Sequence, residues 1–177
     1  MRFVLNLLIL LMLTGLLAGA VYLYQQDHER ERNIEQTRDQ VRRIEQQIKL
    51  QGTLGDLGLT DRGYPATLDP DWFDPGLPLN ALLSAAHPWV EIAHEDQAAL
   101  SHPLDPVARY RSQAQFWYNP YTGIIRARVP AMPSDRSTLE LYNRVNGSRL
   151  TSLFDMTTER ETLFEPVNPP RRSRSRR

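Results

Sequence analysis

An apolar run of 22 residues near the start of the chain constrains its fold more than any other feature. Residues 3–24 read FVLNLLILLMLTGLLAGAVYLY, carry no charge, and include only two clearly polar side chains, Asn6 and Thr14. An α-helix rises about 1.5 Å per residue, so this run forms a helix of about 33 Å, close to the hydrocarbon thickness of a bilayer. The run therefore predicts a single transmembrane helix.

A cleaved signal peptide is the alternative interpretation of the same run. Residues 18–20 (AGA) have the small-residue pattern of a cleavage site. However, the apolar region of a signal peptide is typically ~7–15 residues long, and this run ends with Tyr22 and Tyr24, aromatic residues suited to a membrane interface. Arg2 and the amino group favour a cytoplasmic N-terminal flank. We therefore predict a single-pass protein of the bacterial cytoplasmic (inner) membrane, with everything after residue 24 on the outer, periplasmic side.

Residues 25–52 predict a polar continuation of this helix. Up to residue 51 they contain no glycine or proline, and their Gln, Glu and Arg are good helix formers. Apolar residues recur at heptad-like spacing, with Thr37 and Gln51 weakening the pattern. These residues are Ile34, Val41, Ile44 and Ile48. The stripe fits either the chain's own domain or a second helix in a coiled coil. We expect Gly52 to end the helix.

Residues 53–165 are predicted to form one small α+β domain, a small antiparallel sheet with short helices. A β-hairpin is its clearest element, because residues 113–118 are strand-like, residues 119–123 (NPYTG) form a turn, and residues 124–129 alternate between two faces. The pattern places Ile125, Ala127 and Val129 on the buried face and Arg126 and Arg128 on the other. This pattern predicts a β-hairpin with one buried face.

Shorter signals surround the hairpin. In the preceding Gly/Pro-rich loop, Trp72 and Phe73 are expected to reach the core. Over residues 80–100 we expect two short helices, the first capped by Asn80 and the second beginning at Pro88. Residues 137–140 (STLE) fit a capping box, followed by a helix that ends at Asn146-Gly147. A last strand is expected over residues 150–156.

Two short strings in this order of elements resemble type IV pilin-like proteins, and more specifically the pseudopilins of type II secretion. Residues 63–69 (GYPATLD) are similar to a segment that follows the long helix there, and residues 116–123 (FWYNPYTG) are similar to a hairpin of those sheets. The resemblance implies a pilin-like α+β fold and a role in a pseudopilus. The family's processing signal is missing, and residues 3–24 contain no glutamate. The resemblance then implies either an unprocessed membrane-resident relative or a diverged one.

Charge is distributed unevenly along the chain. Residues 53–170 carry nine Arg against fifteen Asp and Glu, whereas residues 171–177 (RRSRSRR) carry five Arg. From residue 166 onward the chain has nothing to bury, so we expect residues 166–177 to form a disordered basic tail. The cluster from Arg171 to Arg177 is the candidate contact for an anionic partner, which could be lipid, glycan, DNA or the acidic domain itself.

No catalytic, cofactor-binding or metal site is predicted. His87, Glu91 and His94 would share one face of a helix, but Pro88 places His87 at its start and no fourth ligand is specified. The aspartates of residues 56–74 lack the spacing of an EF-hand and are better suited to capping turns. These are Asp56, Asp61, Asp69, Asp71 and Asp74. The chain has no cysteine, phosphate-binding loop or nucleophile elbow.

The hairpin aromatics allow two interpretations. Phe116, Trp117 and Tyr118, with Arg126 and Arg128, could form a stacking platform for single-stranded nucleic acid or sugar. Aromatic residues of a two-sided hairpin are more often part of the core, and we expect that here.

Three classes of function follow from these features. The first is a structural or assembly component of a pseudopilus or secretion-type machine, without catalysis or a small-molecule substrate. It would contact the membrane, and protein partners through residues 25–51 or the exported domain. The second is a membrane-tethered coiled-coil scaffold of the cell envelope. The third is an exported binding protein released by cleavage after Ala20. The predicted hairpin favours the first, because small coiled-coil scaffolds usually lack a sheet domain.

Overall fold

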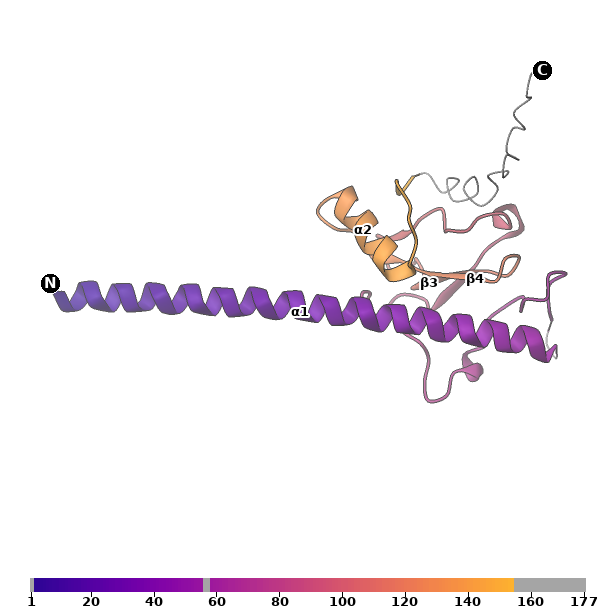
Figure 1. Ribbon diagram of the computed structural model, residues 1–177, viewed down its shortest axis with the longest axis horizontal. Coiled ribbons are helices and arrows are strands. Elements are labelled where there is room, and N and C mark those ends of the chain that lie inside the picture. Colours follow the sequence, from indigo (N-terminus) through magenta and orange to yellow (C-terminus); the bar gives the residue numbers. More distant parts are fainter. Residues whose placement is uncertain (1, 56–57, 155–177) are drawn as a thin grey trace, which may run out of the picture.

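The computed structural model describes residues 2–55 and 58–154, and has an α+β fold with a long N-terminal helix, a small mixed sheet and a short helix. The helices are α1 (Arg2–Leu54) and α2 (Asp135–Asn146), with 3-10 turns η1 (Pro70–Trp72) and η2 (Glu95–Gln97). The strands are β1 (Val90–Ile92), β2 (Val107–Ala108), β3 (Phe116–Asn119), β4 (Ile124–Ala127) and β5 (Val129–Pro130). The other elements gather along the C-terminal half of α1 (Figure 1).

Helix α1 is continuous through both predicted segments and ends at Leu54, two residues after the predicted stop. The residue that follows the helix, Gly55, has a φ of 72°, and its N–H bonds to Gln51 O at 3.3 Å. A positive φ of this kind is common after a helix and favours glycine. Gly52 has a different role, because a Cβ there would lie 2.7 Å from the carbonyl oxygen of Gly63. Gly52 therefore permits a close approach between helix and loop.

The predicted hairpin is confirmed, but the sheet around it is mixed rather than antiparallel. Strand β3 pairs antiparallel with β4 and parallel with β1, so the strand order is β1-β3-β4. The turn closes through the N–H of Gly123, which bonds to Asn119 O at 2.8 Å. A second, two-stranded sheet pairs β2 with β5 in parallel and was not predicted.

The prediction of two helices over residues 80–100 is wrong. Asn80 does not cap a helix; its Oδ1 accepts the N–H of Leu82 in a local turn. Pro88 O accepts the N–H of Gln115 at 2.8 Å, so the residue predicted to begin a helix bonds instead to the segment before β3. Pairing with β3 supplies β1 with hydrogen bonds that its three residues cannot make alone.

The N-cap of helix α2 lies three residues before the one predicted by the capping box. Ser134 is the N-cap, and its hydroxyl accepts the N–H of Ser137 at 3.1 Å. The predicted end is confirmed, because Gly147 has a φ of 62°. Of the strand expected over residues 150–156, the described part to residue 154 is not a strand; Asn143 Oδ1 accepts the N–H of Leu150 there instead. The tail of residues 166–177, with Arg171 to Arg177, lies outside the described residues.

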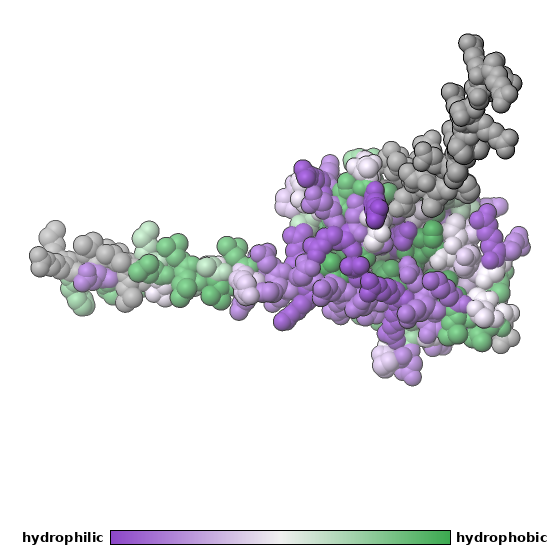
Figure 2. All heavy atoms as spheres, viewed as in Figure 1, coloured by the Kyte–Doolittle hydropathy of each residue, from purple (hydrophilic) through white to green (hydrophobic). Residues whose placement is uncertain are grey.

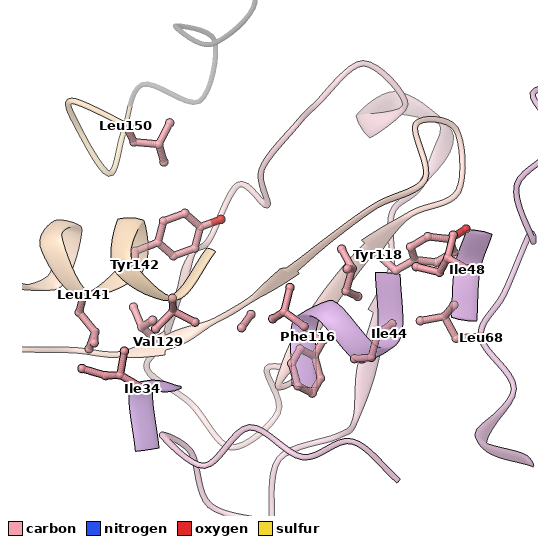
Figure 3. Packing of buried hydrophobic residues seen from close by; sticks show 14 of the residues in the cluster. Ile34, Ile44, Ile48, Leu68, Phe116, Tyr118, Val129, Leu141, Tyr142 and Leu150 are labelled. Carbon is pink, nitrogen blue, oxygen red and sulfur yellow. The ribbon is translucent and has the colours of Figure 1, made fainter. Parts of the chain in front are cut away.

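One hydrophobic core joins the C-terminal half of α1 to the sheet and α2 (Figure 3). Ile44 and Ile48 of α1 are fully buried, as are Phe116 and Tyr118 of β3. The predicted contribution of Phe73 to this core is confirmed. The heptad-like stripe therefore packs on the chain's own domain, as one of its two interpretations proposed.

The N-terminal part of α1 has the opposite environment. We call residues 3–24 the apolar arm, residues 30–54 the packed half of α1, and residues 58–154 the head. The large apolar side chains described in the arm are exposed, from 47% for Leu7 to 79% for Phe3. Figure 2 shows this apolar surface projecting beyond the polar surface of the head. Within the described residues, no helix meets the length and apolarity required to cross a membrane.

Candidate interaction surface

The three residues considered as metal ligands do not share a helical face. His87 Nδ1 lies 2.8 Å from the carbonyl oxygen of Gln113, and His94 is exposed at the N-cap of η2. Glu91 lies in β1 and pairs with Arg128 at 2.9 Å. No group of three or more His, Cys, Asp or Glu that could hold a metal ion occurs among the described residues.

The acidic loop after α1 organises turns where it is described. Asp69 Oδ1 accepts the N–H of Asp71 at 2.9 Å, which caps the η1 turn. Asp61 and Asp74 are exposed, and Asp56 lies outside the described residues. The capping role expected for this loop is therefore confirmed at Asp69.

The hairpin aromatics belong to the core, so the alternative of a stacking platform is wrong. Phe116, Trp117 and Tyr118 are each 0% exposed. Tyr118 donates its hydroxyl proton to Pro65 O at 2.8 Å. Burial, with a smaller contribution from Tyr64, raises the pKa of the Tyr118 phenol well above its usual value. These rings are closed to a ligand.

Arg128 is a buried structural residue, although strand alternation placed it on the face opposite the predicted buried one. Its guanidinium donates to Asp105 O at 2.8 Å, to Ala114 O at 3.2 Å and to Glu91 Oε2 at 2.9 Å. Buried arginine requires this kind of pairing. Each partner comes from a different segment, so no local sequence signal identifies the cluster.

The two strings that resemble pseudopilin segments lie against each other in the head. The ring of Tyr64 lies so close to Gly123 that any Cβ there would overlap it. Tyr118 donates to the carbonyl oxygen of Pro65, and Thr60 donates to Pro120 O at 3.2 Å. Residues 60–65 therefore form a lid over the hairpin turn, at the end of the head farthest from the arm.

At the other end of the head, a groove of about 540 Å³ separates α1 from α2. An ion pair between Glu31 and Arg144 joins the two helices there. Arg30 Nη2 lies 3.4 Å from the sulfur of Met132, in the segment that leads from β5 to α2. The groove thus marks where α1 leaves the head toward the arm.

The apolar arm and the adjoining end of the head form the strongest candidate interaction surface, because they combine exposed apolar area with exposed charge. Comparisons with protein-family models, curated protein sequences and solved structures gave no match.

Proposed function

We propose that this protein is a membrane-anchored structural component of the bacterial cell envelope. In this proposal the apolar arm inserts into the cytoplasmic membrane and the head lies on its outer, periplasmic side. The observation that supports it most strongly is the contrast within α1, where an apolar, exposed arm continues directly into a half that is packed on the head.

Burial of the exposed side chains of the arm in a bilayer is energetically favourable. Moving a Leu-sized side chain from water to an apolar medium gains about 1.5–3 kcal/mol. The large apolar residues exposed in the arm are Phe3, Val4, Leu7, Leu11, Met12, Leu13, Leu16, Leu17, Val21 and Leu23. They are distributed around the helix, so one packing partner on one side would leave many of them in water. A bilayer covers all sides at once.

Within this class, we propose a pseudopilin-like assembly role without catalysis. The packed half of α1 against a small sheet fits that family's plan, and the contacts of Tyr64 and Pro65 with the hairpin join the two strings that carry the resemblance. The coiled-coil scaffold is less well supported, because Ile34, Val41, Ile44 and Ile48 are buried by the head and cannot also bind a second helix.

The test is the mass and N-terminal residue of the protein in membrane and soluble fractions of expressing cells. We expect the full-length chain in the membrane fraction after alkaline extraction, with the head cleaved by protease added from the periplasmic side. A soluble product beginning at Val21 would overturn the anchor and leave the exported binding protein. A full-length soluble chain would overturn both the membrane anchor and the exported binding protein.

A further inference from the structure

We propose that the turn formed by Arg109, Tyr110 and Arg111, which we call the RYR turn, is a second membrane contact that binds the headgroups of anionic phospholipids. This inference rests on the proposed function, because it requires the arm to be inserted in the same membrane.

Strand pairing places the RYR turn at the end of the head that faces the arm. Strand β2 runs parallel to β5, with Ala108 opposite Pro130. Beyond β5 the chain reaches Met132, whose sulfur lies 3.4 Å from Arg30 of α1. Since the two strands run in the same direction, the turn that follows β2 lies on the Met132 side of the head, toward the level of Arg30 along α1.

This level is close to the membrane surface that the arm defines. Arg30 lies six residues after Tyr24, which corresponds to about 9 Å along the helix axis. The headgroup layer extends about 5–8 Å beyond the hydrocarbon on each side, and an ordinary helix tilt of about 20° brings one side of the head closer. Extended arginine side chains on that end of the head therefore reach the phosphates.

Hydrogen bonds within the head hold the turn in one conformation. Gln113 Oε1 accepts the N–H of Arg109 at 2.6 Å and the N–H of Tyr110 at 2.9 Å, and the N–H of Gln113 bonds to Tyr110 O at 3.1 Å. These bonds use backbone atoms of the RYR turn and leave its side chains exposed, with Tyr110 at 69%. A preformed turn loses little conformational freedom on binding.

The exposed side chains match the chemistry of a lipid headgroup layer. Guanidinium groups bind phosphate oxygens through paired hydrogen bonds, and tyrosine is suited to the boundary between apolar and aqueous phases. Among the described residues, no ion pair involves Arg109 or Arg111. Of the exposed acids where α1 leaves the head, Glu31 is paired with Arg144, which limits the repulsion of anionic lipid by that carboxylate, whereas Asp27 and Glu29 act against the binding.

The experiment measures how close the turn lies to the lipid headgroups. Because the chain has no cysteine, Ser112→Cys gives a single labelling site beside the turn, and Arg62→Cys gives one on the loop at the opposite end of the head. Each full-length variant is labelled with a fluorophore and reconstituted into vesicles that carry a headgroup-linked quencher. One set of vesicles is zwitterionic, and the other contains anionic phosphatidylglycerol.

We expect stronger quenching at position 112 than at position 62, and an increase at position 112 in anionic vesicles. Arg109→Gln with Arg111→Gln should remove that increase, because two arginines near an anionic surface predict an about 30-fold fall in the ratio of docked to undocked heads. The control, Arg38→Gln with Arg62→Gln, removes the same charge from exposed residues elsewhere and should retain the increase in the Ser112→Cys background.

Vesicle flotation of each variant separates the two proposals. If the protein floats but position 112 is quenched no more than position 62, or independently of lipid charge and of the two arginines, the membrane contact is wrong and the anchor stands. A protein that does not float overturns both. If only a partner protein, and not anionic vesicles, protects position 112, the turn is a protein-binding site and the inference is also overturned.

Discussion

The two parts of α1 belong to one helix but bury their apolar residues in different ways. In the packed half, apolar residues form one stripe among polar ones, and the head covers that stripe. In the arm, the described apolar side chains occur all around the helix and are exposed. A stripe needs one folded partner, whereas an apolar surface on all sides needs a surrounding apolar phase. The distribution of apolar residues around a helix therefore indicates what must cover it.

The largest expected effect comes from placing a charge in the packed half. Ile44 is 0% exposed, so Ile44→Asp should lower the free energy of unfolding of the head by about 4 kcal/mol or more, because an unpaired carboxylate would be buried. Urea unfolding in detergent, followed by the fluorescence of the three tryptophans of the head, measures this. Leu17→Asp in the arm is the matched control and should leave head stability unchanged. Equal losses from both substitutions would contradict the division of α1 into two environments.

The reciprocal substitution tests the arm. Leu13 lies near the centre of the apolar run, where arginine costs about 2.5–3.5 kcal/mol of membrane insertion. We therefore expect Leu13→Arg to reduce recovery in the membrane fraction while the unfolding midpoint of the head stays constant. Gln46→Arg on the exposed face of the packed half should change neither quantity. An unfolded head in Leu13→Arg would show that the arm contributes to head stability.

A smaller effect is expected at the end of the head farthest from the arm. Tyr118→Phe leaves Pro65 O without its buried donor and should cost about 1–2 kcal/mol. The pKa of Tyr118 is raised in the folded state, so the stabilisation from its neutral phenol is complete below the unfolded pKa of about 10. It declines as the pH rises above that value, by up to about 1.4 kcal/mol per pH unit.

Stability measured between pH 8 and 11 checks this dependence. Tyr118→Phe should reduce the alkaline decline of the wild-type protein, whereas Tyr110→Phe, which changes an exposed phenol, should retain it. An equal decline in both variants would show that another group causes the alkaline loss.

The smallest effect is expected where the two parts of α1 meet. Both side chains of the Glu31–Arg144 ion pair are about half exposed, so water weakens their attraction. Glu31→Gln should cost less than about 1 kcal/mol. Asp39→Asn, which removes a more exposed pair within α1, should cost still less. A loss above about 2 kcal/mol from Glu31→Gln would show that this contact holds the head on α1 more strongly than its exposure indicates.

Elements specified by neighbouring residues were predictable from the sequence. The β3–β4 hairpin has alternating residues joined by a turn, and α2 ends at a glycine with positive φ. Strands β1, β2 and β5 were missed because each has only two or three residues and depends on a distant partner. Val90 pairs with Phe116 and Val107 with Val129, more than 20 residues later in each case. Short extended segments carry no periodic signal of their own.

Of the candidate surface, the apolar arm was predictable from the sequence and the RYR turn was not. The arm was evident from its composition alone. The RYR turn was not, because its conformation depends on Gln113 and its position depends on the β2–β5 pairing. The burial of Arg128 was not predictable for the same reason, since its guanidinium is satisfied by Glu91 and by carbonyls of distant segments.

The unbroken course of α1 also has a mechanical consequence. Residues 20–51 contain neither glycine nor proline, which are common causes of sharp kinks. The helix therefore fixes the orientation of the head relative to the arm, and a rotation of one end about the helix axis rotates the other. Inserting one residue between Tyr24 and Arg30 would rotate the head by about 100° around the helix axis and move it only about 1.5 Å farther from the arm. The number of residues in this segment thus sets the rotational orientation of the head about the axis of α1.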